Sequence, residues 1–116
     1  MRFHVISLFP DTVAAYLGDS ILGRAQEDKK LVVKYYNPRD FTKDKHARVD
    51  RRPYGGGPGM VLEAEPFLKA VAKAQGKKSA KKTKRTKTVF FSPSGKQFTN
   101  DMARSWAKKY DDIIFL

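Results

Sequence analysis

Four short apolar runs, separated by segments of helical period, constrain the fold of this chain more than any other feature. They cover residues 2–9, 31–36, 88–91 and 112–116 and are rich in β-branched and aromatic residues. No turn signal of the β-hairpin type joins them, so helices are expected to connect one strand to the next. The sequence therefore predicts an α/β fold with a mainly parallel sheet and flanking helices, in which ligands bind at the carboxyl ends of the strands.

The segments between these runs carry helix signals. Asp11 or Thr12 caps a short helix that ends at Gly18, and Asp19 or Ser20 starts a second one. The first expected helix carries Val13, Ala14, Tyr16 and Leu17, and the second carries Ile21, Leu22 and Ala25. A third, between Pro66 and Gly76, has a buried stripe of Phe67, Leu68, Val71 and Ala74, and a fourth, after a cap at Thr99 or Asn100, has Met102, Trp106 and Tyr110 on one face.

The chain is strongly basic and lacks cysteine. It has 24 Lys and Arg against 12 Asp and Glu, which gives a formal net charge of +12 and indicates an anionic partner. The absence of cysteine excludes disulfides, cysteine-based zinc sites and thiol catalysis, and two histidines are too few for a histidine metal cage. No run approaches the roughly 18 apolar residues of a membrane span, so we expect a cytoplasmic protein that binds neither a membrane nor a metal.

Segment 76–88 concentrates much of this charge, with seven basic residues and no acidic one. Its internal repulsion and its lack of large apolar side chains predict a solvated loop between a helix and a strand. Two interpretations stay open: a tolerated insertion, or an electrostatic arm for an RNA backbone.

Residues 37–60 are polar and show no helical or strand period, so we expect a long functional loop. Three consecutive glycines at 55–57 are followed by Pro58 and Gly59, which lets the backbone adopt positive φ angles and lie against a flat ligand or a phosphate. The segment has neither the Gly-Lys-Ser/Thr of a Walker loop nor the strand-to-helix position of a dinucleotide-binding motif. A purely structural turn is the alternative for the glycines taken alone.

Charged residues of alternating sign precede the glycines and favour a functional loop. Arginine and lysine bind phosphates, and Asp50 has the acceptors that a guanine's N1–H and amino group require. His46 alone is expected to be a hydrogen-bonding loop residue, and His4, within the first strand, is expected to be structural. An ion-paired surface loop is the alternative for any one of the charged residues.

Taken together, these segments resemble the TrmD-type bacterial tRNA (guanine-N1)-methyltransferases. The matching stretches are ISLFP at 6–10, GRA at 23–25, NPRDFT at 37–42, DKH at 44–46, VD at 49–50, RPYGGGPGM at 52–60, and SP at 92–93 with Gly95. Their order and spacing fit the family over nearly the whole chain, and the stretch at 52–60 is highly specific. Position 51 is Arg where the family usually has a second Asp.

The resemblance implies a SPOUT-class fold with a trefoil knot, a homodimer, S-adenosylmethionine as methyl donor, and methylation of N1 of the tRNA guanine 3′ of the anticodon (guanine 37). The turn after the third strand would lie against the adenosine of the donor, so the expected cofactor-binding residues are Phe90, Phe91, Ser92, Pro93, Ser94 and Gly95. For either phenylalanine, an aromatic position in the sheet core is the equally open alternative. The residues expected to contact the substrate RNA are Arg39, His46, Asp50, Arg52, Tyr54, Gly55, Gly56, Pro58 and Gly59.

The family's knot region, catalytic residues and carboxyl-terminal tRNA-binding domain would follow Leu116. Residues 1–116 are therefore expected to be the amino-terminal part of the methyltransferase domain, inactive alone and without a catalytic residue. Asp50 is the one candidate base for the N1 proton, and orientation of base and donor would be the main source of rate. A second hypothesis is a stand-alone basic RNA-binding protein, against which we count an exposed apolar edge at 113–116.

Overall fold

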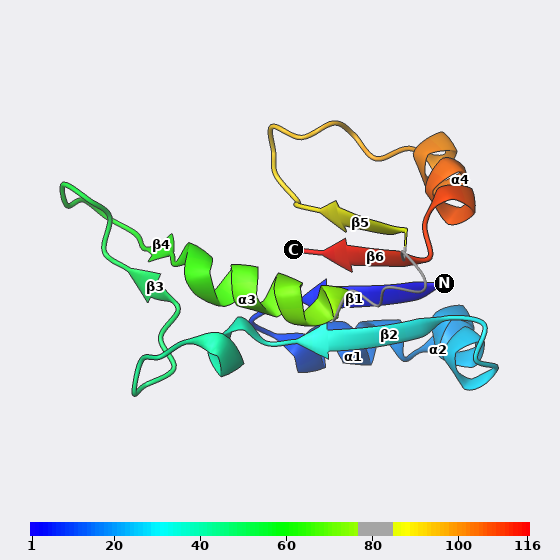
Figure 1. The fold of residues 1–116 in the computed structure, drawn as a ribbon, viewed down its shortest axis with the longest axis horizontal. Helices are drawn as coiled ribbons and strands as arrows, with labels where there is room; N and C mark the ends of the chain where they lie inside the picture. Colours follow the sequence, from blue (N-terminus) through cyan, green and yellow to red (C-terminus); the bar gives the residue numbers. More distant parts are fainter. Residues whose placement is uncertain (77–84) are drawn as a thin grey trace.

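The computed structural model describes residues 1–76 and 85–116 and places four strands in one sheet (Figure 1). These strands are β1 (Arg2–Ile6), β2 (Val32–Tyr36), β5 (Thr86–Val89) and β6 (Asp112–Phe115). They lie in the order β2-β1-β6-β5, and every neighbouring pair is parallel. The prediction of an α/β fold with a mainly parallel sheet is confirmed.

Helices flank this sheet on both faces. They are α1 (Pro10–Leu17), α2 (Ser20–Glu27), α3 (Ala64–Gln75) and α4 (Asn100–Lys109). Helix α3 lies on one face, α1 and α2 lie on the other, and α4 stands at the end of the sheet where β6 begins (Figure 1). The side chains of Asp19 and Thr99 cap α2 and α4, at positions that the sequence predicts.

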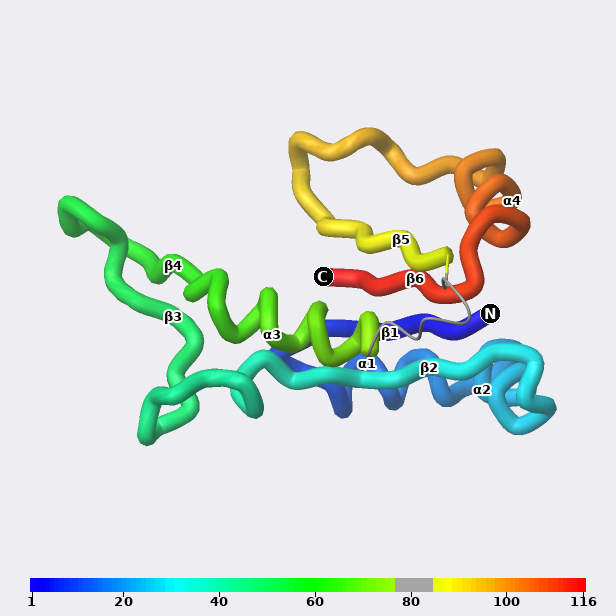
Figure 2. The backbone as a smooth tube through the Cα atoms, viewed as in Figure 1, coloured from blue at the N-terminus to red at the C-terminus, as the bar shows by residue number. Residues whose placement is uncertain are grey.

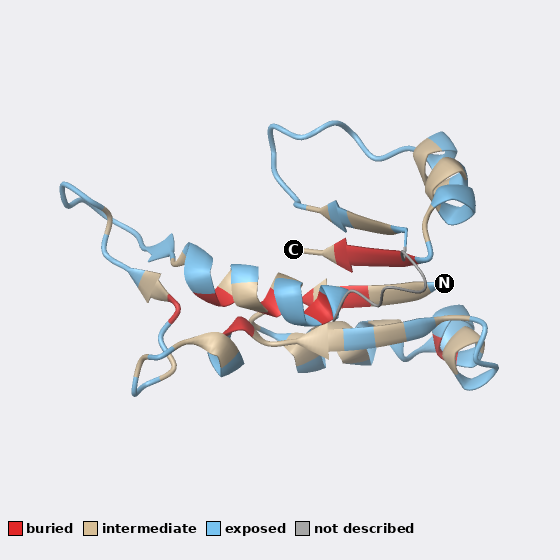
Figure 3. Ribbon diagram, viewed as in Figure 1, coloured by how far each residue is buried: buried red, intermediate tan, exposed pale blue. Residues whose placement is uncertain are grey.

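The core lies between α3 and the sheet. Ile6 and Ile114 of the sheet are buried against Ala70 and Ala74 of the helix (Figure 3). Leu68 is 66% exposed, so its predicted place in the buried stripe is wrong. It precedes Ala70 by two positions, which puts it on nearly the opposite side of a helix.

The helices outside this core bury few large side chains. Tyr16 of α1 and Ile21 of α2 are 80% and 71% exposed. Helix α4 has no buried residue; its Trp106 packs against Phe98 with 5.3 Å between ring centroids, and the Nζ atom of Lys87 lies 5.6 Å from the centre of the Trp106 ring. Large apolar side chains of α1 and α2 therefore stay accessible to solvent.

Strand β6 is an inner strand rather than an edge. Strands β1 and β5 flank it on both sides, and its Ile113 and Ile114 are 4% and 0% exposed. The expectation of an exposed apolar edge at 113–116 is therefore wrong, because the edges of this sheet are β2 and β5. Such an edge consequently does not weigh against a stand-alone RNA-binding protein.

Several element boundaries also differ from prediction. Strand β5 covers 86–89 instead of 88–91, because its register is fixed by pairing with β6, in which Thr86 lies opposite Asp112. Strand β1 ends at Ile6 rather than at residue 9, and residues 7–9 form a short turn that leads into α1. Helix α1 begins at Pro10, whose fixed φ suits the first helical position.

Helices α1 and α2 meet at two glycines. Gly18 ends α1, as predicted, and a Cβ atom added to Gly23 would lie only 2.2 Å from the carbonyl oxygen of Gly18. Gly23 is the buried residue of α2. Close packing of two helices thus accounts for the glycine of the GRA stretch at 23–25.

A buried polar chain crosses three strands of the sheet. The Nε2 atom of His4 lies 2.9 Å from Asp112 Oδ1, its Nδ1 lies 3.1 Å from the Tyr36 hydroxyl, and Arg2 donates to Asp112 Oδ2 at 2.8 Å. Burial raises the pKa of Asp112, but the hydrogen bonds from Arg2 and His4 outweigh it, and the pKa lies below its ordinary value. His4 is structural, as expected from its place in a strand.

Residues 37–62 contain more regular structure than predicted. They form the 3-10 helix η1 (Pro38–Phe41) and an antiparallel pair of strands, β3 (Asp50–Arg51) and β4 (Val61–Leu62). Strands of two residues are too short to show an alternating sequence pattern. We call residues 50–62 the arm, because they project away from the sheet beyond the start of α3 (Figure 2).

The predicted Lys-rich loop at 76–88 falls mainly on residues 77–84, which lie outside the described residues. Gly76 ends α3, as predicted, with a φ of 69°. Across residues 1–76 and 85–116 no helix is long and apolar enough to cross a membrane.

Candidate nucleic-acid interface

The tip of the arm needs glycine for its backbone conformation. Gly55, Gly56, Gly57 and Gly59 have φ angles of 81°, 82°, 104° and 92°, in the region that other L-residues rarely adopt. A Cβ atom added to any of these four would meet nothing within 4 Å. Conformation rather than crowding explains them, and all residues from 54 to 62 are exposed. The arm therefore offers an uncovered backbone to a ligand.

Asp50 lies at the base of the arm among arginines. A cavity of about 370 Å³ there is lined by Arg48, Asp50, Arg51, Arg52 and Met60. Arg51 forms an ion pair with Glu63, whereas Arg48 and Arg52 have no ion-pair partner among the described residues. The cavity thus combines a carboxylate acceptor with two uncommitted guanidinium groups, which are the groups that bind a guanine edge and a phosphate.

Tyr54 extends from the arm into solvent, with an exposed fraction of 102%. A larger cleft of about 740 Å³ runs between the arm and the start of α3; its lining residues are Arg51, Arg52, Tyr54, Val61, Leu62, Glu63, Ala64 and Glu65. Its acidic residues are paired: Glu63 with Arg51, and Glu65 with Lys69 at 2.6 Å. The cleft therefore presents an aromatic ring and apolar side chains beside one uncommitted cation, Arg52.

A compact loop at 42–48 positions His46. The Asp44 carboxylate accepts the backbone N–H groups of His46 and Arg48 at 2.7 and 3.2 Å, and the Thr42 hydroxyl donates to the Arg48 carbonyl at 2.9 Å. These N–H donors hold the pKa of Asp44 below its ordinary value. No separate role was assigned to Thr42 or Asp44 from the sequence, although Asp is a residue type whose side chain commonly accepts the N–H two residues further on, as in an Asx turn.

Arg39 is engaged within the protein. Its guanidinium donates to the Leu8 carbonyl at 2.9 Å and lies 5.9 Å from the centre of the Phe9 ring. It thereby ties η1 to the turn between β1 and α1. Its contact with RNA stays a prediction, and its structural role was not anticipated.

The turn at 92–95 follows β5 at the carboxyl edge of the sheet, as predicted. The Gly95 N–H donates to the Ser92 carbonyl at 3.0 Å, and the Ser94 N–H donates to the Ser92 hydroxyl at 3.3 Å. These two N–H donors are used inside the turn. The exposed Pro93 and Phe91 give an apolar surface beside this turn, and its contact with adenosine stays a prediction.

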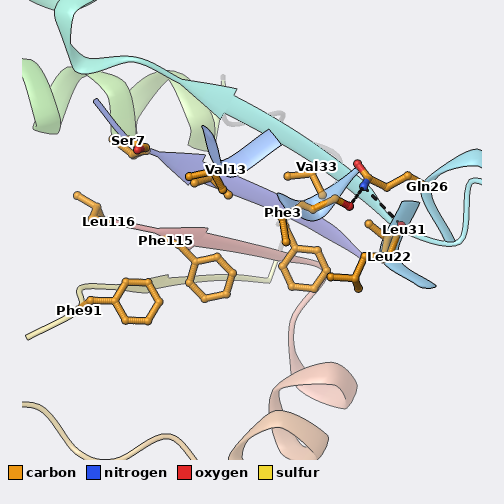
Figure 4. A pocket seen from close by; sticks show the side chains of 13 residues that line it. Phe3, Ser7, Val13, Leu22, Gln26, Leu31, Val33, Phe91, Phe115 and Leu116 are labelled. Carbon is orange, nitrogen blue, oxygen red and sulfur yellow. Dashed lines mark hydrogen bonds between the residues drawn. The ribbon is translucent and has the colours of Figure 1, made fainter. Parts of the chain in front are cut away.

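Phe91 packs on the sheet. Its ring stacks on Phe115 with 5.6 Å between centroids, and Phe3 stacks on Phe115 from the other side at 6.0 Å. Together they line an apolar cavity of about 470 Å³ on the sheet face that carries α1 and α2 (Figure 4). Both phenylalanines are largely exposed, Phe91 at 67% and Phe90 at 74%, so neither is a buried core residue, and their contact with adenosine stays a prediction.

The predicted site residues fall into separate groups. Asp50, Arg52, Tyr54 and the glycines lie together on the arm, whereas Arg39 and the turn at 92–95 lie elsewhere (Figure 1). Within the part of the chain that the structure describes, no group of three or more His, Asp or Glu side chains is placed to hold a metal ion. The arm is the only one of these groups in which charged, aromatic and glycine residues converge.

Comparisons with known proteins agree on one family. A family model described as tRNA (Guanine-1)-methyltransferase TrmD matches residues 1–116. A "tRNA (guanine-N(1)-)-methyltransferase" of Pseudoalteromonas atlantica is 47% identical over 97 residues, which cover 84% of this chain and 35% of the relative. A protein of the same name from Caldanaerobacter subterraneus is 46% identical over 110 residues, which cover 93% of this chain and 42% of that relative. Another from Clostridium botulinum is 40% identical over 116 residues, which cover 100% of this chain and 45% of that relative.

This chain spans less than half the length of these relatives. The match nevertheless includes the whole arm and the carboxyl edge of the sheet, since it runs over residues 1–116. The chain belongs to the TrmD family of tRNA (guanine-N1)-methyltransferases.

Proposed function

We propose that this chain supplies the guanine-binding arm and one wall of the methyl-donor site of an enzyme that methylates N1 of guanine 37, 3′ of the anticodon in tRNA. The observation that carries the proposal is the cavity at the base of the arm, where Asp50 lies beside Arg48 and Arg52. The carboxylate accepts hydrogen bonds from the N1–H and amino group of an anticodon-loop guanine, and the arginines bind adjoining phosphates. The family name supports tRNA as the substrate.

The donor of the proposed reaction is S-adenosylmethionine, which supplies a methyl group carried on a sulfonium. Phe91 and Pro93 would form an apolar wall beside its adenine, as the turn after β5 allows. N1 of guanine carries a proton that has to leave as the new bond forms. Asp50 is the carboxylate that lines the arm cavity, and holding the base in place is the main contribution of this chain.

We expect the 116-residue chain alone not to transfer a methyl group, because the proposal gives it only one wall of the donor site. A homodimer belongs to the proposal through the family resemblance. A stand-alone basic RNA-binding protein is the second candidate, supported by the net charge of +12.

Binding of two anticodon stem-loop RNAs that differ only in G or A 3′ of the anticodon tests the proposal. Fluorescence anisotropy is expected to show about tenfold tighter binding of the G form, since a bidentate base contact is worth roughly 1–3 kcal/mol. Asp50→Ala removes the preference, and Asp40→Asn, in the exposed turn of η1, preserves it. Equal affinity for both RNAs with a steep salt dependence would overturn the proposal in favour of the second candidate.

A further inference from the structure

We propose that Tyr54 is a stacking platform for an unpaired RNA base, with Arg52 binding the phosphate of the same nucleotide. This inference rests on the proposed function, because it describes how the same arm holds its RNA. It concerns the cleft between the arm and α3, which adjoins the Asp50 cavity through Arg51 and Arg52 and adds Tyr54 to it.

Tyr54 contributes nothing to the packing of the arm. Its side chain is 102% exposed, and the residues on either side of it are exposed or half-buried as well. A ring in this position leaves both of its faces free for a flat partner, which would gain by burying it.

The backbone presents this ring in a defined place. The N–H of Gly56 donates to the carbonyl of Pro53 at 3.1 Å, which closes a turn around Tyr54. Pro53 restricts the backbone before the ring, and the positive φ angles of Gly55 and Gly56 set the direction after it. Because the conformation is set beforehand, little ordering has to accompany binding.

The surroundings of the ring select the ligand. Val61 and Leu62, 49% and 53% exposed, line the same cleft and give a flat base apolar contact beside the ring. Arg52 supplies the cation for one phosphate, while the acidic groups of the cleft are already paired with Arg51 and Lys69. Bases are free to stack on protein rings in single-stranded loops and not within a duplex, so the ligand is a loop nucleotide of RNA.

Binding of the 116-residue chain to a fluorescent RNA hairpin with a single-stranded loop, and to a fully paired duplex of the same stem, tests this inference. Tyr54→Ala is expected to weaken hairpin binding about five- to hundredfold, the range for loss of one stacked base. Tyr54→Phe retains the ring and binds the hairpin like the parent chain. Tyr16→Ala is the matched control, because Tyr16 is 80% exposed on α1, away from the arm, and its loss leaves binding unchanged.

Hairpin binding by Tyr54→Ala as tight as that of the parent chain overturns the inference. If Tyr54→Phe weakens hairpin binding as much as Tyr54→Ala does, the inference is also overturned, because the effect then belongs to the hydroxyl. Equal weakening of duplex binding also overturns it. Thermal unfolding is expected to be the same for all variants of Tyr54. If the parent chain prefers the G form of the stem-loop over the A form, and Tyr54→Ala binds RNA as tightly as the parent chain, only the stacking role fails. If the parent chain binds no RNA, the proposed function fails as well.

Discussion

At the scale of single residues, the carboxylate of Asp112 joins side chains of neighbouring strands within the sheet. It is 3% exposed, a position that is costly for a charge unless donors surround it. Arg2 and His4 provide those donors, and Tyr36 completes the chain on the far side of the imidazole. Strands β6, β1 and β2 are therefore linked by side chains as well as by backbone hydrogen bonds.

The lowered pKa of Asp112 predicts an acid-sensitive contribution to stability. A carboxylate whose pKa in the folded chain lies below its ordinary 3.8 stabilises the fold above that pH, and the contribution is lost as the pH falls through the lowered pKa. Asp112→Asn is expected to cost about 1–3 kcal/mol at neutral pH and to remove this acid sensitivity. Urea unfolding at neutral and acidic pH measures both effects. An Asp112→Asn chain with the same acid sensitivity as the parent would contradict this role.

Gly23 gives a second prediction at this scale. Gly23→Ala places a methyl group 2.2 Å from the Gly18 carbonyl oxygen, so helices α1 and α2 have to separate. We expect a loss of about 1–3 kcal/mol in the free energy of unfolding, as for other overpacked positions. Arg24→Ala, one residue further along and exposed, is the control and should change it by less than about 0.5 kcal/mol. Equal effects of the two changes would contradict a packing role for Gly23.

At the scale of elements, the sequence predicted the strands and helices well and the arm poorly. The helix caps at Asp19 and Thr99 could be predicted, because each cap side chain accepts a hydrogen bond from the first turn of its own helix. The strands β3 and β4 could not be predicted, because a strand of two residues shows no alternation of apolar and polar side chains. Their pairing forms across a loop of glycines. The displacement of β5 by two residues has a similar cause, since pairing with β6 outweighs the hydrophobicity of Phe90 and Phe91.

The arm gives the prediction at this scale, through the salt dependence of RNA binding. Arg52→Ala removes an uncommitted cation of the arm, so the slope of log affinity against log salt should become about 0.7 less steep, the change expected when one phosphate is no longer neutralised. Lys30→Ala is the control: it also removes one positive charge, but Lys30 lies between α2 and β2 and pairs with Asp28 at 2.8 Å. An unchanged slope for Arg52→Ala, or the same change for both variants, would contradict phosphate binding by Arg52.

At the scale of the whole molecule, the sheet forms one end and the arm extends from the other, beyond α3 (Figure 2). This arrangement separates the residues that hold the fold from those proposed to hold RNA. His4 and Asp112 lie buried in the sheet, whereas the residues from 54 to 62 are all exposed. Changes in the arm are therefore expected to alter binding with little effect on stability.

Part of the candidate site could be predicted from the sequence because it is contiguous. The glycines and Tyr54 belong to one stretch of nine residues at 52–60, and the chain needs no folding to bring them together. The contact between Arg39 and the Leu8 carbonyl joins residues far apart in the chain, and no local pattern announces it. The Asp50 cavity could be predicted in part. Most of its lining residues are neighbours in the sequence, but the ion pair of Arg51 with Glu63 depends on the fold of the arm.

Exchange of this chain into a relative tests the central claim most directly. The Clostridium botulinum relative aligns with all 116 residues, so its matching region is replaced by residues 1–116 and the chimera is assayed for N1-methylation of the tRNA guanine 3′ of the anticodon. We expect methylation by the chimera and its loss on Asp50→Ala. A chimera that folds and binds tRNA but leaves N1 unmethylated would contradict the claim that this chain forms the guanine-binding part of the enzyme.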